Sequence, residues 1–330
     1  MLDAVRGVPD HFAQGVAFAG QIGVEARGVR RAILCGMGGS AFPGDLLKMY
    51  SDPLGVDLSV SREYSVRAAD LGADTLVIAS SYSGNTEETI AALADARARG
   101  ARVVILSAGG ELAAIAARDG LPAVKLERPT PGFQPRAATG FFLGALAAIL
   151  ENAGLLPGGA AAMIAIGDGM RRHTDGVEDR ALALAKALDG RIPVIYATAP
   201  FEPVALIAKI KFNENAKTPA FSYALPELNH NEMVGYTRLP GPFSAVVLDD
   251  PDAPSRAQHR VATTVATLET AGVPVIRVPL PAGEPPLVKA FAALYLFDFV
   301  TCAHAALGGI DPNPVAMVED FKARLGPYVP

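Results

Sequence analysis

Apolar residues in the first half of the chain form short, nearly continuous runs that alternate with segments of helical length. Runs that are apolar at almost every position are typical of parallel strands buried on both faces of a sheet. Glycine and polar residues separate these runs from the predicted helices at 44–50, 86–99 and 111–118. The first half is therefore predicted to fold as an α/β sandwich. The predicted strands are 31–35, 56–60, 75–80, 102–107 and 123–126.

The same alternation returns in the second half of the chain. Four apolar runs are followed by segments of helical length, so the second half is predicted to repeat the architecture of the first. The predicted fold class is α/β, with two α/β/α sandwich domains that each hold a mainly parallel sheet flanked by helices. The predicted strands are 192–197, 219–223, 243–248 and 273–278, and the predicted helices are 202–217, 254–271, 286–307 and 314–325.

A Gly- and Ala-rich stretch at 152–169 separates the two halves. It contains Pro157, shows no strand pattern, and precedes a segment that predicts one long helix at 168–188. A chain of 330 residues fits two domains of roughly 150 residues each. We therefore predict a first domain at 1–155 and a second domain at 156–330.

Composition and charge exclude several classes of function. With a net charge of -5 and no long run of Lys or Arg, the chain lacks the electrostatic footprint of a nucleic-acid binder. The N-terminus does not resemble a signal peptide, and no uncharged apolar run of about 20 residues could span a membrane. Cys35 and Cys302 lie in separate apolar segments and are interpreted as buried thiols of a reducing compartment. We expect a cytoplasmic protein.

The end of the predicted strand at 75–80 carries the first candidate binding site. The sequence Ser-Tyr-Ser-Gly-Asn-Thr occupies 81–86, and a helix is predicted to begin at about Thr86. The hydroxyls of Ser81, Ser83 and Thr86, with free backbone N–H groups at a helix N-terminus, are the donors that a phosphate monoester needs. A well-capped turn without a ligand is the alternative, because these residue types are common before helices.

A second loop of the same kind follows the predicted strand at 31–35. Its sequence is Gly-Met-Gly-Gly-Ser at 36–40, and a helix is predicted from about Pro43. Because the carboxyl ends of parallel strands share one edge of a sheet, Gly39 and Ser40 are expected to meet the same anion as the loop at 81–86. The spacing is not Gly-x-Gly-x-x-Gly, and no acidic residue ends the next strand, which argues against a dinucleotide.

Two residues of the second half are candidates for acid–base chemistry. Glu214 follows Ile207 and Ile210 at helical spacing and lies near a predicted helix C-terminus, where a negative charge is disfavoured. Burial there would raise the pKa of Glu214 and suit it to carry a proton. A surface Glu paired with a nearby Lys is the alternative. His230 is a candidate proton donor or an ordinary loop histidine. No histidine spacing indicates a metal site, and no cofactor is expected.

Two cations complete the set of candidates. Arg136 precedes a predicted helix at about Ala137 and is either an electrostatic stabiliser of a developing anion or a surface or phosphate-positioning arginine. Lys322 lies on the last predicted helix, just off the apolar side marked by Val318 and Phe321. Its ammonium could therefore enter a cleft, although a solvated lysine is the ordinary interpretation.

Several motifs together resemble a known family. The loops at 36–40 and 81–86 resemble the sugar isomerase (SIS) domain. Gln-Pro-Arg-Ala-Ala-Thr-Gly at 134–140, Phe-Asn-Glu-Asn-Ala-Lys at 212–217 and Pro-Glu-Leu-Asn-His-Asn-Glu at 226–232 resemble the bifunctional phosphoglucose/phosphomannose isomerases. The resemblance covers nearly the whole chain. It implies two SIS domains and an aldose–ketose isomerase that forms fructose 6-phosphate from glucose 6-phosphate through a cis-enediol, without a metal.

The resemblance also implies a role for each candidate residue. Glu214 matches the base that moves a proton between carbons 1 and 2, and Arg136 matches the cation that stabilises the intermediate. His230 matches a histidine contributed across a homodimer interface to open the sugar ring, and Lys322 matches a lysine that assists it. The segment 311–319 lacks the hydroxyl residue that helps the family accept both carbon-2 epimers, so mannose 6-phosphate is less strongly expected as a substrate.

A non-catalytic phosphosugar sensor is the principal alternative, because it would keep the serine loop. Such a sensor needs neither Glu214 nor His230, and no appended effector domain is visible. An aminosugar synthase would need an N-terminal glutaminase domain with a nucleophilic cysteine, which the sequence lacks. A phosphorylated hexose is thus the expected partner of the chain.

Overall fold

The computed structural model describes residues 1–20, 22–24, 27–129, 133–238, 241–326 and 328. Its contacts divide the chain into two compact units. The N-terminal unit contains Arg6–Asp168 and Ala316–Pro330, and the C-terminal unit contains Met1–Val5 and Gly169–Val315. Both units therefore receive a short segment from the opposite end of the chain.

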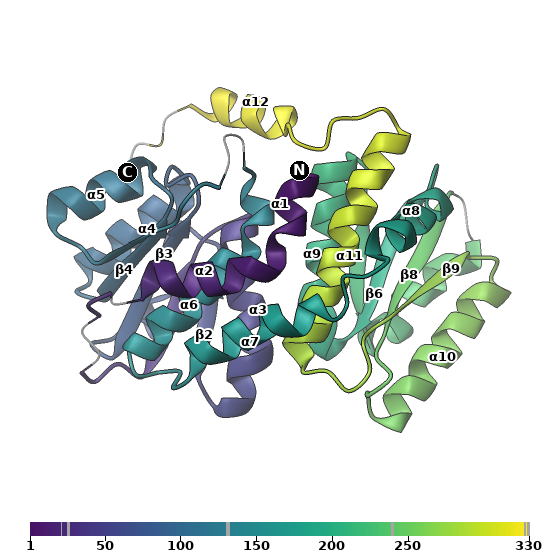
Figure 1. Ribbon diagram of the computed structural model, residues 1–330, viewed down its shortest axis with the longest axis horizontal. Coiled ribbons are helices and arrows are strands. Elements are labelled where there is room, and N and C mark those ends of the chain that lie inside the picture. Colours follow the sequence, from purple (N-terminus) through teal and green to yellow (C-terminus); the bar gives the residue numbers. More distant parts are fainter. Residues whose placement is uncertain (21, 25–26, 130–132, 239–240, 327, 329–330) are drawn as a thin grey trace. The chain divides into compact units, whose positions relative to one another are not determined.

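The N-terminal unit is built on one parallel sheet of five strands in the order β2-β1-β3-β4-β5 (Figure 1). All five strands lie within two residues of their predicted positions. The prediction succeeds because each strand is apolar along nearly its whole length and glycine or polar residues end it. The strands are β1 (Arg31–Cys35), β2 (Asp57–Ser61), β3 (Thr75–Ser81), β4 (Arg102–Ser107) and β5 (Ala123–Lys125).

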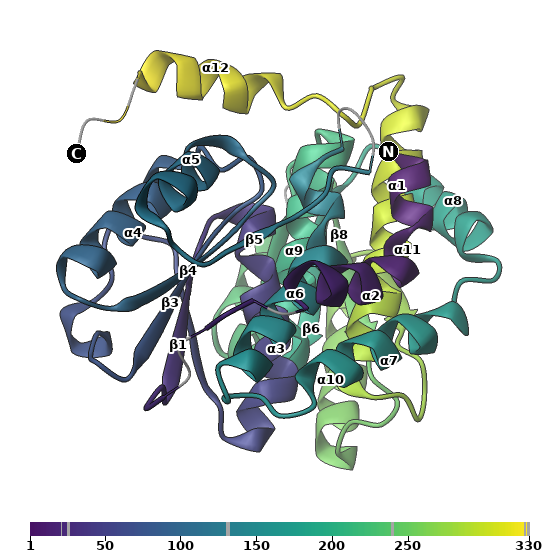
Figure 2. The same ribbon diagram turned by 60° about the vertical axis from the view of Figure 1, so that its left-hand side comes forward.

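Helices cover both faces of this sheet. Ile33, Val77 and Ile105 are buried on the face covered by α4 (Glu87–Ala98) and α5 (Gly110–Asp119). Figure 2 shows α3 (Phe42–Ser51) and α6 (Thr139–Asn152) on the opposite side. The two buried faces explain why the strands are continuously apolar rather than alternating.

The C-terminal unit repeats the arrangement with a parallel sheet in the order β7-β6-β8-β9. Val194, Tyr196 and Val247 point to the face that α10 (Ser255–Thr270) covers. Helices α8 (Val177–Ala187), α9 (Glu202–Lys211) and α11 (Pro286–Leu307) pack together elsewhere in this unit. The strands are β6 (Ile192–Thr198), β7 (Phe221–Leu225), β8 (Phe243–Asp249) and β9 (Val275–Pro279). The predicted α/β class with two repeated sandwiches is confirmed.

The prediction of one helix at 168–188 is wrong. Helix α7 (Gly159–Arg171) occupies most of the Gly- and Ala-rich stretch at 152–169, and α8 begins only at Val177. The Gly and Ala residues serve close helix packing, since a Cβ on Gly167 would lie 2.3 Å from the carbonyl oxygen of Pro9 in α2 (Val8–Ala19). Helix α1 (Leu2–Arg6) and α2 were not predicted at all.

Helix α11 is long and apolar enough, by length and composition, to cross a membrane. However, 72% of its apolar window is buried inside the protein. Its charged residues Lys289 and Asp298 are buried with ion-pair partners from the same unit. We therefore interpret α11 as the core helix of the C-terminal unit.

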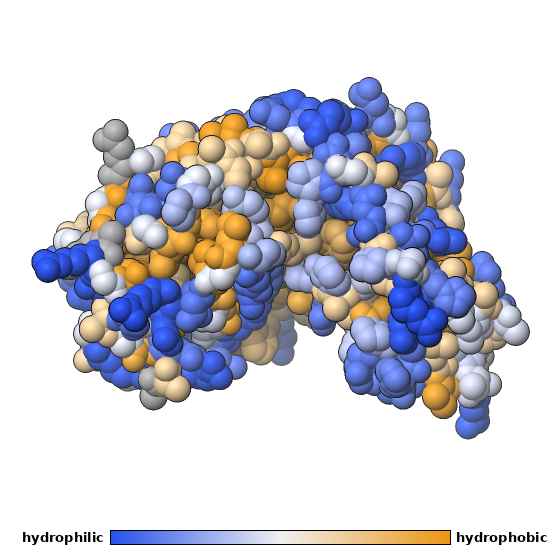
Figure 3. Space-filling view, turned by 90° about the horizontal axis from the view of Figure 1, so that it is seen from below, coloured by the Kyte–Doolittle hydropathy of each residue, from blue (hydrophilic) through white to orange (hydrophobic). Residues whose placement is uncertain are grey.

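Hydrophobic residues also reach the surface, and Figure 3 shows some of them among hydrophilic ones on one face. Helix α12 (Ala316–Leu325), which lies at the upper edge in Figure 1, carries further exposed hydrophobic residues, and none of its residues is buried. Met317 and Phe321 on this helix are 86% and 62% exposed. The apolar side predicted for the last helix thus exists in the sequence but is uncovered in the single chain.

Candidate active site

The candidate phosphate loop leaves the sheet at the carboxyl end of β3. Ser81 is the last residue of β3, and α4 begins at Glu87 (Figure 1). The first-turn amides of Glu87, Glu88 and Thr89 have no acceptor within the helix, as at every helix N-terminus. They and the helix dipole favour an anion at this position.

Two hydrogen bonds join this loop to the loop that follows β1. The backbone N–H of Tyr82 donates to Ser40 Oγ at 3.0 Å, and Ser80 Oγ donates to the carbonyl oxygen of Ser40 at 2.8 Å. Gly36 permits this approach, since a Cβ there would lie 2.7 Å from the carbonyl oxygen of Ser80. The two glycine- and serine-containing loops therefore lie side by side, as their positions on the sheet predict.

Within the loop, the Ser81 hydroxyl lies close to two other hydroxyl groups. Ser81 Oγ lies 2.8 Å from Thr86 Oγ1 and 3.4 Å from Ser83 Oγ, and Ser81 is only 1% exposed. Thr86 is at the N-cap position of α4, but its side chain makes no capping bond. Ser83 is exposed and Thr86 is half-buried. Ser81 thus braces the loop, while Ser83 and Thr86 present the more accessible hydroxyls.

Some backbone amides that could be expected to face a ligand are already used inside the loop. Gly84 N–H donates to Ser81 Oγ at 3.1 Å, and Asn85 N–H donates to Ser83 Oγ at 3.2 Å. The Asn85 side chain in turn accepts the N–H of Glu111 at 2.9 Å, in the first turn of α5. The loop is therefore a preformed structure tied to the neighbouring helix.

The aromatic ring of Tyr82 anchors the same loop in the unit. It is buried, lies 6.0 Å from the rings of Phe133 and Phe142, and has the guanidinium of Arg128 at 5.6 Å from its centroid. Burial raises the pKa of Tyr82 to about 12, although the nearby Arg128 acts in the opposite direction. Tyr82 is therefore a neutral packing residue of the candidate loop.

Arg136 lies close to the loop after β1. It occupies a short 3-10 turn at Pro135–Ala137, and a Cβ on Gly39 would lie 3.2 Å from the backbone nitrogen of Arg136. The side chain is 4% exposed and donates to Gln134 Oε1 at 3.1 Å. The buried position disfavours the surface-arginine interpretation. The N-terminal unit thus brings Arg136 and both loops together.

Glu214 lies in the C-terminal unit on a π-helical turn, Phe212–Ala216, which follows α9 directly. A π turn closes with one residue more than an α turn, so helical spacing counted from Ile207 does not hold at Glu214. The predicted helix at 202–217 is corrected accordingly. The Glu214 side chain is half-buried. Single π turns often occur at functional sites, and no property of this sequence had indicated one.

The residues around Glu214 hold the turn in place. Asn213 Nδ2 donates to the carbonyl oxygen of Thr218 at 3.0 Å, and the buried Asn215 Nδ2 donates to Thr301 Oγ1 of α11 at 3.0 Å. One turn earlier, Lys211 forms a buried ion pair with Asp298 of α11. The two asparagines of Asn-Glu-Asn are thus structural, and they leave Glu214 between them as the acidic group.

His230 is exposed at the end of a 3-10 turn, Glu227–His230, that follows β7. No hydrogen bond holds its ring among the residues that the structure describes. Its neighbours are fixed: Asn229 Nδ2 donates to Thr264 Oγ1 at 2.9 Å, and Asn231 Nδ2 donates to Glu227 Oε1 at 2.8 Å. The motif therefore places the exposed imidazole of His230 at the surface of the chain.

Glu232, the last residue of this motif, is a structural group. Its carboxylate accepts a hydrogen bond from the buried hydroxyl of Tyr196, which also lies 2.6 Å from the hydroxyl of Tyr236. Burial, followed by the bond to Glu232, raises the pKa of Tyr196. Glu232 is therefore committed to the core of the C-terminal unit.

Lys322 is exposed on α12, and its Nζ lies 2.8 Å from Glu319 Oε1. This is a solvent-exposed pair of the kind that contributes little to stability. The structure places Lys322 in the N-terminal unit together with Arg136 and the loops, whereas Glu214 and His230 belong to the C-terminal unit.

In the second sheet, carboxylates stand at the position that corresponds to the candidate phosphate loop of the first sheet. Strand β8 takes the same place in its sheet as β3, and it is followed by Asp250 and Asp252. Both carboxylates lie 2.6 Å from Nζ of Lys289, which is 4% exposed. The hydrogen bond from Lys289 lowers the pKa of Asp252, so it stays ionised and would repel a phosphate. The loop after β8 is therefore unsuited to phosphate.

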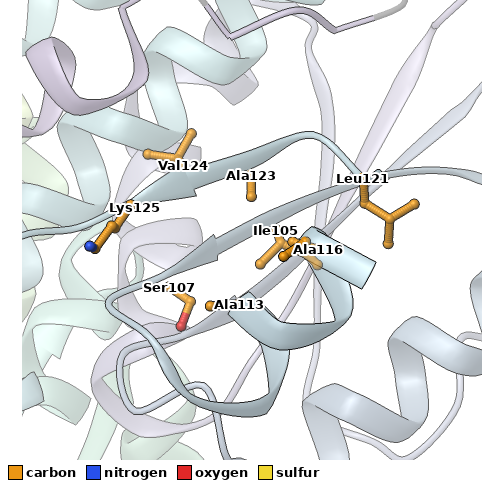
Figure 4. Close-up of a pocket in the computed structure, with 9 residues that line it drawn as sticks. Ile105, Ser107, Ala113, Ala116, Leu121, Ala123, Val124 and Lys125 are labelled. Atoms are coloured by element: carbon orange, nitrogen blue, oxygen red, sulfur yellow. The ribbon is translucent and has the colours of Figure 1, made fainter. Parts of the chain in front are cut away.

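A cavity of about 320 Å³ lies between α5 and strands β4 and β5 (Figure 4). Most of its lining is aliphatic, and Figure 4 shows Ala113, Ala116 and Ile105 beside it. Two polar residues, Ser107 and Lys125, also line it, and Ser107 Oγ donates to the carbonyl oxygen of Gly109 at 2.8 Å. None of the predicted site residues lines this cavity, so we do not assign it to the active site.

Comparison with known proteins shows which families the chain resembles. The family described as the bacterial phospho-glucose isomerase C-terminal SIS domain matches residues 177–325, and the SIS domain family matches residues 27–118. The bifunctional phosphoglucose/phosphomannose isomerase of Caldicellulosiruptor bescii is 33% identical, over 98% of each chain. The D-glucosamine-6-phosphate 4-epimerase of Sulfolobus acidocaldarius is 33% identical, over 62% of this chain and 64% of its own.

A solved structure shows the same fold at lower sequence identity. The C-terminal domain of glucosamine-fructose-6-phosphate aminotransferase from Francisella tularensis has a TM-score of 0.76 and 13% identity, and the match covers 95% of this chain and 98% of that one. It supports the fold alone. With the curated relative at 33% identity, these matches place the chain in the bacterial phosphoglucose/phosphomannose isomerase family, which has two SIS domains.

Proposed function

We propose that this phosphosugar isomerase interconverts glucose 6-phosphate and fructose 6-phosphate in the cytoplasm through a cis-enediol, without a metal, and that mannose 6-phosphate is a further candidate substrate. The observation that carries the proposal is the preformed loop at 81–86, in which Ser81 holds Ser83 and Thr86 at the N-terminus of α4. An anionic group fits these donors, and a hexose 6-phosphate offers one at the end of the sugar opposite to carbons 1 and 2.

In the proposed complex, the N-terminal unit holds the phosphate and supplies a cation. Ser83, Thr86 and the first-turn amides of α4 bind the phosphate oxygens, and Gly39 and Ser40 line the adjoining loop. Arg136 is permanently charged and buried next to that loop. A fixed cation in a site of low polarity stabilises the negative charge of an enediolate more strongly than water would.

The C-terminal unit supplies the acid–base groups in this mechanism. Glu214 takes the proton from carbon 2 of the open-chain aldose and returns it to carbon 1, which gives the ketose. The π turn and its flanking asparagines keep this carboxylate in one place. Holding the base at the right distance and orientation to the reacting carbon increases the rate by several orders of magnitude.

His230 and Lys322 are assigned to opening of the sugar ring, with His230 acting in the site of a second subunit of a homodimer. The exposed imidazole supports this assignment, because within one chain it lies at the surface and its neighbours are fixed. A neutral imidazole has one nitrogen that donates a proton and one that accepts a proton, as ring opening requires.

The first test is a side-by-side assay of the purified protein with fructose 6-phosphate, glucose 6-phosphate, mannose 6-phosphate and glucosamine 6-phosphate, with a chelator present. We expect turnover between fructose 6-phosphate and glucose 6-phosphate. Phosphosugar binding without any turnover would favour the sensor. Turnover of glucosamine 6-phosphate alone would favour a 4-epimerase, the activity named for one of the relatives.

A second test separates the enzyme from the sensor at one residue. Glu214→Gln should abolish turnover and leave the affinity for fructose 6-phosphate within a few-fold of the wild type, because the amide keeps the shape of the carboxylate but cannot accept the proton. Glu269→Gln, at an exposed carboxylate of α10, serves as the matched control and should be fully active. Full activity of Glu214→Gln would remove this residue from the mechanism.

A mixing experiment tests the shared site. Glu214→Gln and His230→Asn are each expected to be inactive, but in a mixed dimer one site receives an intact Glu214 from one chain and an intact His230 from the other. Unfolding and refolding the two variants together should therefore restore activity. If the mixture stays inactive while refolded wild type recovers, His230 does not act across an interface.

A further inference from the structure

Lys217 has a backbone conformation that side chains usually avoid. Among the described residues, it is the only one other than glycine with a positive φ, at φ 54° and ψ 29°. The left-handed region brings Cβ close to the following carbonyl oxygen, so this position after a helical turn is ordinarily a glycine. A lysine that is kept in such a conformation suggests that its side chain has a task.

The Lys217 ammonium binds two carbonyl oxygens from different parts of the C-terminal unit. Nζ donates to the carbonyl oxygen of Glu214 on the π turn and, at 3.2 Å, to the carbonyl oxygen of Pro312. Pro312 belongs to the loop that leads along the chain to α12, which carries Lys322. One side chain thus connects the turn of the proposed base to that loop.

The loop around Pro312 is itself shaped by hydrogen bonds. Asp311 Oδ1 accepts from both the backbone N–H and the side-chain Nδ2 of Asn313, each at 2.9 Å. These bonds lower the pKa of Asp311, the backbone bond being the largest cause, with a further contribution from the charge of Lys217. Asp311 therefore remains ionised, and its hydrogen bonds to Asn313 fix the orientation of the Pro312 carbonyl towards Lys217.

We propose that Lys217 is a positioning residue for Glu214. Its ammonium fastens the end of the π turn to the loop at 311–313, while Asn213 and Asn215 fix the other sides of the turn. The direction of the Glu214 carboxylate is then set from three sides. This inference rests on the proposed function, in which Glu214 transfers the proton.

The variant Lys217→Gly separates positioning from a merely structural role. Glycine favours a left-handed backbone, so the turn should be at least as stable as in the wild type, although the whole side chain with its ammonium is lost. We expect kcat to fall by roughly ten- to a hundredfold with KM within about twofold, because the base is displaced and the phosphate contacts remain. Lys217→Arg keeps the charge and several donors, and should recover a large part of kcat.

Two readouts make the result decisive. The melting temperature of Lys217→Gly should not fall, and the isotope effect with substrate deuterated at carbon 2 should rise, because proton transfer by a displaced base becomes the slow step. Wild-type kcat and an unchanged isotope effect in Lys217→Gly would overturn the inference and leave Lys217 as an ordinary helix cap.

A double-mutant cycle tests the connection to the loop. Asp311→Ala removes the acceptor that shapes the loop, and should lower kcat in the wild type but have little further effect in Lys217→Gly. Independent, multiplicative effects would contradict the connection through Pro312. If the wild type turned over no hexose phosphate, the proposed function would fail, and this inference with it; an active wild type with active variants would refute the inference alone.

Discussion

The variant Gly84→Ala tests the phosphate loop at its tightest point. Gly84 has φ +75°, and a Cβ there would lie 1.7 Å from the carbonyl oxygen of Gly109. Real Cβ contacts are essentially never below 3.0 Å. The loop at 81–86 and the loop that contains Gly109 must therefore separate by more than about 1 Å. The hydrogen bond from Gly84 N–H to Ser81 Oγ would then be lost, and with it the bracing of Ser83 and Thr86.

Gly100→Ala is the matched control for this variant. Gly100 has φ +74°, nearly the same value, but nothing lies within 4 Å of its added Cβ. Each variant should lose about 1–2 kcal/mol of unfolding free energy from the left-handed backbone, and Gly84→Ala about 1 kcal/mol more for each hydrogen bond lost. Denaturant unfolding measures both values.

The kinetic consequence should appear in one variant only. A shift of about 1 Å in the phosphate loop is expected to raise KM for fructose 6-phosphate by roughly ten- to a hundredfold, and to weaken competition by inorganic phosphate similarly. Gly100→Ala should keep the wild-type KM. Equal KM values for both glycine variants would refute the assignment of 81–86 as the phosphate site.

Two further predictions concern the interior of each unit. Burial lowers the pKa of His11 to about 4 from 6.5. As the pH falls, the unfolded chain binds this proton before the folded chain does. The contribution of His11 to the unfolding free energy should therefore be fully present above pH 6.5 and be lost, by about 3 kcal/mol, as the pH drops towards 4. His11→Phe, which keeps the stack on Phe141, should remove that part of the pH dependence in unfolding titrations. Lys211→Met strands the buried carboxylate of Asp298 and should cost about 3–5 kcal/mol, whereas adding Asp298→Leu should recover much of it. An unchanged midpoint in Lys211→Met would show that the pair contributes nothing.

The strands could be predicted from the sequence because burial on both faces leaves a strong and local signal. Helix α7 could not, since Gly167 and its small neighbours imitate a linker, although they are small because α2 approaches closely. The break after α7 was missed for a related reason: Arg172 and His173 leave the helix to bind Glu284, a residue far away in sequence. Long-range contacts of this kind have no local pattern.

The candidate site likewise has one part that the sequence could predict and one part that depends on long-range contacts. The positions of Ser81, Ser83 and Thr86 follow from a strand that ends before a helix, which any parallel sheet shares. The π turn at Glu214 depends on Asn215 reaching Thr301 in α11, and no periodicity reveals that contact. Motif resemblance identified Glu214, whereas helical spacing gave an incorrect account of how it is held.

In the proposed mechanism, Glu214 moves a proton between carbons 1 and 2 of a sugar held by its phosphate. The most direct measurement is deuterium incorporation at carbon 2 of glucose 6-phosphate when fructose 6-phosphate is converted in deuterated water. The wild type should incorporate deuterium to the extent that the proton held by Glu214 exchanges with solvent before it returns to the sugar. Glu214→Gln should show neither product nor incorporation while still binding fructose 6-phosphate. Incorporation by Glu214→Gln at the wild-type rate would contradict the mechanism.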